Sequence, residues 1–171
     1  MIAYVRGPAR FVRLPEDGGD VADDCTGASG ECADTMLRIR VAGKTFTARL
    51  EEEAAPQTVA AFKGLLPYAE RLIQARWSGE SGWIPLGDFQ LGVGIENATS
   101  YPSPGEILFY PGGFSETEIL FPYGRTCFAS TMGQLAGNHF LTIVEGNDQL
   151  KEVGRCIVWE GAQEIVFENA E

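Results

Sequence analysis

The run QARWSGESGWIPLGDFQLGVGIENATSYPSPGEILFYPGGFSETEILFPY occupies residues 74–123 and holds most of the paired aromatic and acidic side chains of this chain. Polar and apolar positions alternate near both of its ends, a pattern typical of half-buried β-strands. Glycine and proline recur between the alternating segments, where tight turns require them. The run therefore predicts β-hairpins that surround one cleft.

Strands and helices are also expected on both sides of this run. Apolar and polar residues alternate over 36–50 around a central glycine, which predicts a β-hairpin. Residues 58–74 have helical spacing of apolar side chains, with a break or restart at Pro67. The later pattern predicts, in order, a strand over 139–144, a helix from residue 147 that loosens at Gly154, and a final strand or hairpin over 155–167.

The number and order of these elements predict a mainly β fold with two helices. Roughly eight short strands separated by turn signals favour a closed antiparallel β-barrel capped by helices. A β-sandwich remains an open alternative. Tandem βαβ units are disfavoured, because only two segments have helical periodicity.

The composition of the chain changes near residue 35. Residues 1–34 are rich in glycine and aspartate and contain few large apolar side chains, so they bury too little surface to offset the entropy of ordering. We interpret 1–34 as a flexible or arm-like extension that docks on a neighbour if it is ordered. We expect 35–168 to form one packed domain and 169–171 to be a tail.

The chain is acidic, with a formal charge of -11 over 171 residues. Nucleic-acid affinity depends on lysine and arginine neutralising phosphates, so DNA, RNA and anionic membrane surfaces are not expected partners. No apolar run is long enough to span a bilayer, and the first residues lack the apolar core of a secretory signal. The spacing of Cys25, Cys32, Cys127 and Cys156 fits neither a zinc pair nor a disulfide framework. We expect a cytoplasmic protein in which Cys127 and Cys156 are buried thiols.

Several short motifs follow one another between residues 58 and 146. They are TV with a following phenylalanine at 58–62, Arg76, GDF at 87–89 and VEG at 144–146, and together they resemble the cyclophilin-like barrel. The segments RWSGESGWIPLGD, ENATSYPSPGEILFYPGG, SETEIL and GQLAGNHF resemble more closely the bacterial DUF3830 family of cyclophilin-like proteins of unknown function. That second resemblance covers about residues 35–168. It implies the barrel and brings no established activity or cofactor.

Most positions that would catalyse prolyl isomerisation in a cyclophilin differ here. Pro85 stands where cyclophilins have a glutamine, Pro111 and Gly112 lie near the place of an Ala-Asn pair, and Gly137 replaces a histidine. Arg76 remains, and an arginine is able to stabilise the twisted amide against its barrier of ~18–20 kcal/mol. The resemblance therefore implies the fold more firmly than the isomerase activity.

One candidate cleft is expected around Arg76. Its guanidinium is suited to a carboxylate or a carbonyl, and Glu80 is expected to hold it in place. Trp77, Trp83 and Tyr110 would supply flat apolar walls. The alternative is a surface Arg–Glu pair beside two core tryptophans.

A second candidate group contains the acidic pair Glu116 and Glu118. Residues two apart share one face of a strand, where each carboxylate raises the proton affinity of the other. With His139, the only histidine, they form a candidate acid–base set, and Asn138 is expected to face the same cleft. The alternative is a solvated acidic face with a hydrogen-bonded histidine. One histidine without a metal-binding spacing predicts no metal site, and no cofactor motif is present.

These features favour a protein that binds a small polar or anionic molecule through Arg76, Trp77, Trp83, Tyr110, Glu116, Asn138 and His139. An enzyme is the first alternative, either a peptidyl-prolyl isomerase or a small-molecule hydrolase or isomerase, with Arg76, Glu80 and Glu118 as catalytic candidates. The second alternative is a structural unit of a homo-oligomer whose cleft holds the 1–34 arm of a neighbour.

Overall fold

A computed structural model describes residues 35–170 of the chain. The predictions for residues 1–34, including the flexible arm, its docking strand and the thiols of Cys25 and Cys32, lie outside the described residues. The division into an arm, a barrel domain and a tail therefore stays a prediction.

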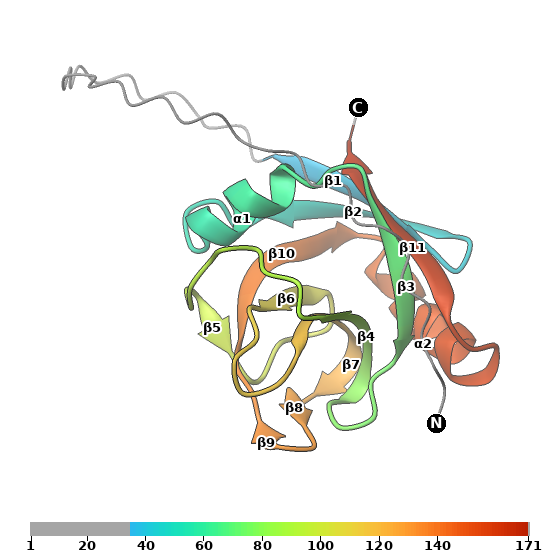
Figure 1. The fold of residues 1–171 in the computed structure, drawn as a ribbon. Helices are drawn as coiled ribbons and strands as arrows, with labels where there is room; N and C mark the ends of the chain where they lie inside the picture. Colours follow the sequence, from blue (N-terminus) through green and yellow to red (C-terminus); the bar gives the residue numbers. More distant parts are fainter. Residues whose placement is uncertain (1–34, 171) are drawn as a thin grey trace, which may run out of the picture. The chain divides into compact units, whose positions relative to one another are not determined.

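Eight antiparallel strands form a closed β-barrel, as expected (Figure 1). Each strand pairs with its neighbours in the order β2, β1, β11, β3, β4, β7, β6 and β10, and pairing of β10 with β2 closes the ring. The strands are β1 (Met36–Val41), β2 (Lys44–Leu50), β3 (Tyr68–Gln74), β4 (Gly79–Gly87), β6 (Glu106–Tyr110), β7 (Thr117–Thr126), β10 (Gly137–Glu145) and β11 (Gln163–Asn169).

Three two-residue strands lie beside the ring. Strand β5 (Ala98–Thr99) pairs with the start of β10. Strands β8 (Ala129–Ser130) and β9 (Gly133–Gln134) form a separate small hairpin after β7. This β8–β9 hairpin lies below the ends of β6 and β7 in Figure 1.

The strands divide their side chains between the inside and the outside of the barrel. On β7, Ile119 and Phe121 belong to the central core, whereas Leu120 belongs to a second apolar cluster on the outer face. Phe62, Phe140 and Phe167 meet edge to face inside the barrel, with ring centroids 4.9 and 5.4 Å from that of Phe62. Such pairs add stability beyond the apolar area that they bury.

Two helices add side chains to the same central core and so close the barrel. Helix α1 (Pro56–Lys63) begins with Pro56, whose missing N–H needs no partner in the first turn, and it buries Val59 and Phe62. Helix α2 (Leu150–Trp159) follows the short 3-10 helix η1 (Asn147–Gln149). Its buried residues Leu150, Val153 and Ile157 have the spacing of one helix face.

The predicted helix over 58–74 is wrong after residue 63. Residues 68–74 read YAERLIQ and form β3, although most of these residue types favour helices in isolation. Pairing of β3 with both β11 and β4 completes the ring, so tertiary hydrogen bonds override the local preference.

The prediction for the C-terminal strand is wrong over 155–159, which belong to α2. The helix continues through Gly154 instead of loosening there. A Cβ atom at Gly154 would overlap the ring of Tyr123 on β7, so the glycine permits close packing of the helix against the barrel. The last strand begins only at Gln163.

A second apolar cluster covers the outer face of β4, β6 and β7. Its buried members are Ala75, Leu108, Tyr110, Leu120, Phe128 and Leu135, and Trp83 packs against them. Because Phe128 and Leu135 flank the β8–β9 hairpin, this cluster fixes the hairpin on the outside of the barrel wall. No helix within residues 35–170 is long and apolar enough to cross a membrane.

Candidate functional site

A pocket of about 150 Å³ lies on this outer face, where the β8–β9 hairpin meets the barrel. We call it the Glu118 pocket. It is lined by Ala75, Arg76, Trp77, Ser78, Trp83, Ser115, Glu116, Glu118 and residues 129–131. Three parts of the chain thus contribute to it: the connection from β3 to β4, the turn before β7, and the hairpin.

Ser78 ties the first of these parts to the third. Its Oγ donates a hydrogen bond to the carbonyl of Ala129 at 3.0 Å and accepts one from the N–H of Ala129 at 3.2 Å. The N–H of Cys127 donates to the carbonyl of Ser78 at 3.1 Å. These bonds hold the hairpin over the β3–β4 connection and so fix the two sides of the pocket.

Tyr110 supports the pocket without lining it. Its hydroxyl accepts hydrogen bonds from the N–H groups of Phe114 and Ser115, at 3.1 and 3.4 Å. Its ring packs edge to face on Phe128, with the centroids 5.8 Å apart. Tyr110 therefore positions the turn that carries Glu116. The sequence predicted it as a wall of the pocket, whereas these contacts make it a support for the turn.

Glu118 is the buried carboxyl of the pocket, with only 5% of its surface exposed. It lies on the outer face of β7, opposite Tyr110 on β6 and Pro85 on β4. Within residues 35–170 its carboxyl has no hydrogen-bond or ion-pair partner. Burial, and next the charge of Glu116, raise the pKa of Glu118 from 4.5 to about 8. The carboxyl is consequently uncharged in most molecules at neutral pH.

The fold brings five of the predicted site residues together in this pocket: Glu118, Arg76, Trp77, Trp83 and Glu116. Arg76 and Glu116 are exposed, Trp83 is half-buried, and Trp77 is 59% exposed. Charged groups therefore lie at the mouth and an uncharged acid lies at the floor.

Glu80 does not orient Arg76, which corrects the predicted pair. Its carboxylate accepts a hydrogen bond from the N–H of Arg125 at 2.8 Å. A register shift in the β4–β7 ladder between Gly79 and Ser81 places the Glu80 side chain beside Gly124. Among residues 35–170, Arg76 makes no ion pair with Glu80.

Asn138 does not line the Glu118 pocket and makes hydrogen bonds within the fold. It is fully buried, and its side chain donates to Thr58 Oγ1 at 3.0 Å and to the carbonyl of Gly94 at 2.8 Å. Its Oδ1 accepts from the N–H of Glu96 at 3.1 Å. All of its main hydrogen-bonding groups are thus used to fix the segment before β5.

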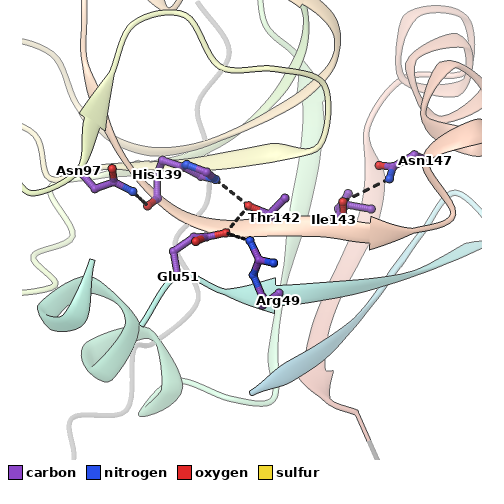
Figure 2. A network of polar contacts seen from close by, with 7 residues as sticks. All are labelled: Arg49, Glu51, Asn97, His139, Thr142, Ile143 and Asn147. Carbon is purple, nitrogen blue, oxygen red and sulfur yellow. Dashed lines mark hydrogen bonds and ion pairs between the residues drawn. The ribbon is translucent and has the colours of Figure 1, made fainter. Parts of the chain in front are cut away.

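His139 belongs to a different network, on β10 and β2 (Figure 2). Its Nε2 lies 2.8 Å from Thr142 Oγ1, and Thr142 donates to Glu51, which also pairs with Arg49 at 3.0 Å. Although burial opposes it, hydrogen bonds from Thr142 and Arg49 hold the pKa of Glu51 below its usual value.

The acid–base set of Glu116, Glu118 and His139 is not assembled in this fold. Strand β6 separates β7 from β10, and neighbouring strands lie about 4.8 Å apart, so Glu118 and His139 stand roughly 10 Å apart or more. Within the described part of the chain, no group of three or more His, Cys, Asp or Glu side chains is placed to hold a metal ion.

A broader and more open hollow of about 440 Å³ lies along β1, α2 and β11. Its charged lining residues Arg40, Glu160 and Glu164 are exposed, and Arg40 pairs with Glu168 at 3.2 Å. Burial, and next the charge of Glu160, raise the pKa of the Cys156 thiol, which makes it a poor nucleophile. The hollow therefore offers less chemistry than the Glu118 pocket.

Both described cysteines are free thiols. Cys156 is buried, as predicted. Cys127 is exposed, which corrects the prediction of a buried thiol there, because it lies in the bend between β7 and the β8–β9 hairpin.

The family described as "Protein of unknown function (DUF3830)" matches residues 37–169. The chain belongs to this family. Among the curated proteins none matches this DUF3830 chain. The family therefore establishes the relationship without adding an activity.

Two solved structures share the fold of this DUF3830 chain. The "Structure of McbB in complex with tryptophan" has 24% sequence identity and a TM-score of 0.61, and the match covers 78% of this chain but only 44% of that one. The "Solution structure of the hypothetical protein AF2241 from Archaeoglobus fulgidus" has 23% identity and a TM-score of 0.53, over 84% of this chain and 100% of that one. At these identities the likeness shows the fold alone.

Several pocket residues were not found from the sequence. Ser78, Ser115 and residues 129–131 complete the lining, but serine, alanine and threonine in turns carry no distinctive chemical signal. The packing of Phe128 and Leu135 on the barrel, together with the hydrogen bonds of Ser78, brings the hairpin to this DUF3830 site.

Proposed function

We propose that this protein binds a small molecule in the Glu118 pocket. A flat part of the ligand lies against Trp77 and Trp83, a polar group meets Glu118, and Arg76 is available at the mouth for an anionic group. The observation that carries the proposal is Glu118 itself, a nearly buried carboxyl that lines a cavity and has no polar partner among residues 35–170.

Such a carboxyl is costly for the fold. A carboxyl at this depth loses part of its solvation without gaining a hydrogen bond from the described part of the chain, and an apolar residue at this position would avoid that cost. Perturbed titratable groups in concave sites are concentrated where proteins bind or transform ligands. A ligand group that bonds to Glu118 would recover the missing interaction.

The size of the pocket limits the ligand. A cavity of about 150 Å³ accepts a group about the size of a benzene ring, so a larger ligand would leave part of itself outside. Exposed Phe114 and Met132, on the neighbouring turn and hairpin, offer apolar contacts to such a part. The fold neighbour McbB has been solved with tryptophan, which supports small-molecule binding on this type of scaffold.

The three tryptophans make a direct test available. The chain contains Trp77, Trp83 and Trp159, so a proton–nitrogen NMR spectrum of the protein has three indole signals. Trp77 and Trp83 line the Glu118 pocket, whereas Trp159 is 80% exposed on α2 and does not line it. Each of the variants W77F, W83F and W159F lacks one indole signal and so assigns it. The Trp159 signal is then an internal control for the two pocket signals.

Small aromatic amines, alcohols and acids at up to about 10 mM are expected to shift the Trp77 and Trp83 signals while the Trp159 signal stays in place. If every probe leaves all three signals unchanged, the proposal is wrong. Equal shifts of all three signals would indicate non-specific contact and would also contradict it.

Proton transfer to a bound substrate is a second candidate function, because the pKa of Glu118 of about 8 lies near neutral pH, where a general acid or base works best. Any turnover by this site should show a pH–rate limb near 8 that E118Q removes. The prolyl isomerase alternative has less support, since Arg76 is the one matching catalytic position. A homo-oligomer and a cytoplasmic location remain predictions from the sequence.

A further inference from the structure

Resting on the proposed function, we infer that the polar group recognised by the Glu118 pocket is a protonated amine. It docks between the carboxyl groups of Glu116 and Glu118, beside the faces of Trp77 and Trp83. The ligand class is therefore a small primary amine with a flat apolar part, and an amino acid is included because Arg76 can meet its carboxylate.

The titratable groups of the pocket suit a cation once Glu118 gives up its proton. The three charged or titratable groups that line it are Arg76, Glu116 and Glu118, so two acids face one guanidinium. From β6, Tyr110 also faces Glu118, but its hydroxyl is held by two backbone N–H groups. Strand β4 contributes Trp83 and Pro85 on this face and the hairpin contributes residues 129–131, none of which is charged.

Arg76 does not neutralise the floor of the pocket. Burial and the negative charge of Glu116 govern the acidity of Glu118, and Arg76 is not among the groups that alter it. An anion at the floor of the pocket would therefore meet Glu116 and a buried acid, whereas the exposed Arg76 is available only to a group at the mouth. An ammonium group meets two acceptors that otherwise have no cationic partner among residues 35–170.

The walls of the pocket also suit a cation. A cation over the face of a tryptophan gains about 0.5–2 kcal/mol, and tryptophan is the best of the aromatic residues for this interaction. The net charge of -11 adds a general attraction for cations at a distance.

Binding of an amine has a proton balance that can be counted. In the free protein at pH 7, a pKa of about 8 leaves Glu118 roughly 90% protonated. When an ammonium ion docks, Glu118 becomes a carboxylate, and its proton passes to the buffer. The reaction is Glu118–COOH plus R–NH₃⁺ giving the ion pair plus H⁺, so binding should release close to one proton.

The test uses isothermal titration of the full chain with three probes that share one ring: benzylamine, benzyl alcohol and phenylacetate. The titrations are done at pH 7 in phosphate and in Tris, two buffers with different enthalpies of ionisation. The difference between the two measured binding enthalpies gives the number of protons released. We expect benzylamine to bind at least 10-fold more tightly than the other two and to release between 0.5 and 1 proton. Net release should fall as pH rises toward 8.5, because more of Glu118 is already ionised in the free protein and the small neutral fraction of benzylamine takes up a proton on binding.

Two variants separate the roles of the carboxyl groups. E118Q copies the shape of the uncharged acid, so it should fold. It should lower the affinity for benzylamine at least 10-fold and abolish the release of a proton on binding. E116Q keeps Glu118 and should lower the affinity for benzylamine by a smaller factor than E118Q does. Glu53→Gln changes an exposed carboxylate before α1 and should leave both quantities unchanged.

The outcomes distinguish this inference from the proposed function. Tighter binding of phenylacetate or benzyl alcohol than of benzylamine, with shifts of the Trp77 and Trp83 signals, would overturn the inference and keep the proposed function. Benzylamine binding without proton release from the unmodified protein would also overturn it. If none of the three probes binds, both are wrong.

Discussion

Replacing Glu118 by glutamine should change how the stability of the protein depends on pH. The pKa of Glu118 is about 8 in the folded protein and close to 4.5 in the unfolded chain. Between these two values the folded protein keeps a proton that the unfolded chain has released. The free energy of unfolding therefore falls as pH rises, by about 1.4 kcal/mol per pH unit.

The window from pH 5.5 to pH 8 isolates this effect. The unmodified protein should lose roughly 3 kcal/mol of unfolding free energy across it, and the stabilising contribution of the protonated acid is fully present below pH 4.5. Lowered pKa values of Glu51 and Glu52 affect stability only at lower pH, where those groups titrate. E118Q cannot titrate, so its stability should stay nearly flat over the same window.

Urea unfolding at pH 5.5, 6.5, 7.5 and 8.5, followed by circular dichroism, measures both proteins directly. The two proteins should be similarly stable at pH 5.5, where the folded protein carries the uncharged acid, and E118Q should become the more stable one by a margin that grows toward high pH. Glu53→Gln, with an exposed carboxylate, should follow the unmodified protein. Equal slopes for the unmodified protein and E118Q would refute the reasoning.

Three further substitutions, and Val158→Ala as a control, test the packing that surrounds the site. Gly154→Ala should destabilise the protein by about 1–3 kcal/mol in urea unfolding, because the added methyl group overlaps Tyr123. In most helix interiors the same change is stabilising. The control Val158→Ala, on the exposed face of α2, should change the free energy of unfolding by less than about 0.7 kcal/mol. Phe128→Ala should cost about 3–5 kcal/mol and also reduce the benzylamine-induced shift of the pocket indole signals, since it anchors the hairpin. Asn138→Ala should cost about 2–4 kcal/mol while leaving benzylamine affinity within twofold, and a large loss of affinity would contradict its structural role.

Much of the barrel follows from alternation along the chain. The hairpin of β1 and β2, the strand β10 and the apolar face of α2 all have the period that their burial requires. The strand β3 was missed because YAERLIQ consists mostly of helix-favouring residues and contains an irregular apolar pattern. Its partners β11 and β4 are specified by the closure of the ring, which no local window contains.

Part of the site was also readable from the sequence. Glu116 and Glu118 line one pocket as expected, although Glu116 lies in the turn before β7, and Trp83 on the neighbouring strand points to the same outer side as Glu118. Glu80 was misplaced because a register shift in β4 moves its side chain, and such irregularities leave no reliable mark in sequence. His139 was misplaced because only the order of strands shows that β6 separates it from β7.

The carboxyl carbon of Glu118, followed by NMR against pH with and without benzylamine, tests the central claim most directly. The carboxyl signal that is absent from the spectrum of E118Q is assigned to Glu118. The account predicts a midpoint near pH 8 in the free protein and a lower midpoint when benzylamine is bound. A midpoint between pH 4 and 5 in the free protein would show that Glu118 is an ordinary solvated carboxylate and would contradict the buried, ligand-binding acid proposed for the Glu118 pocket.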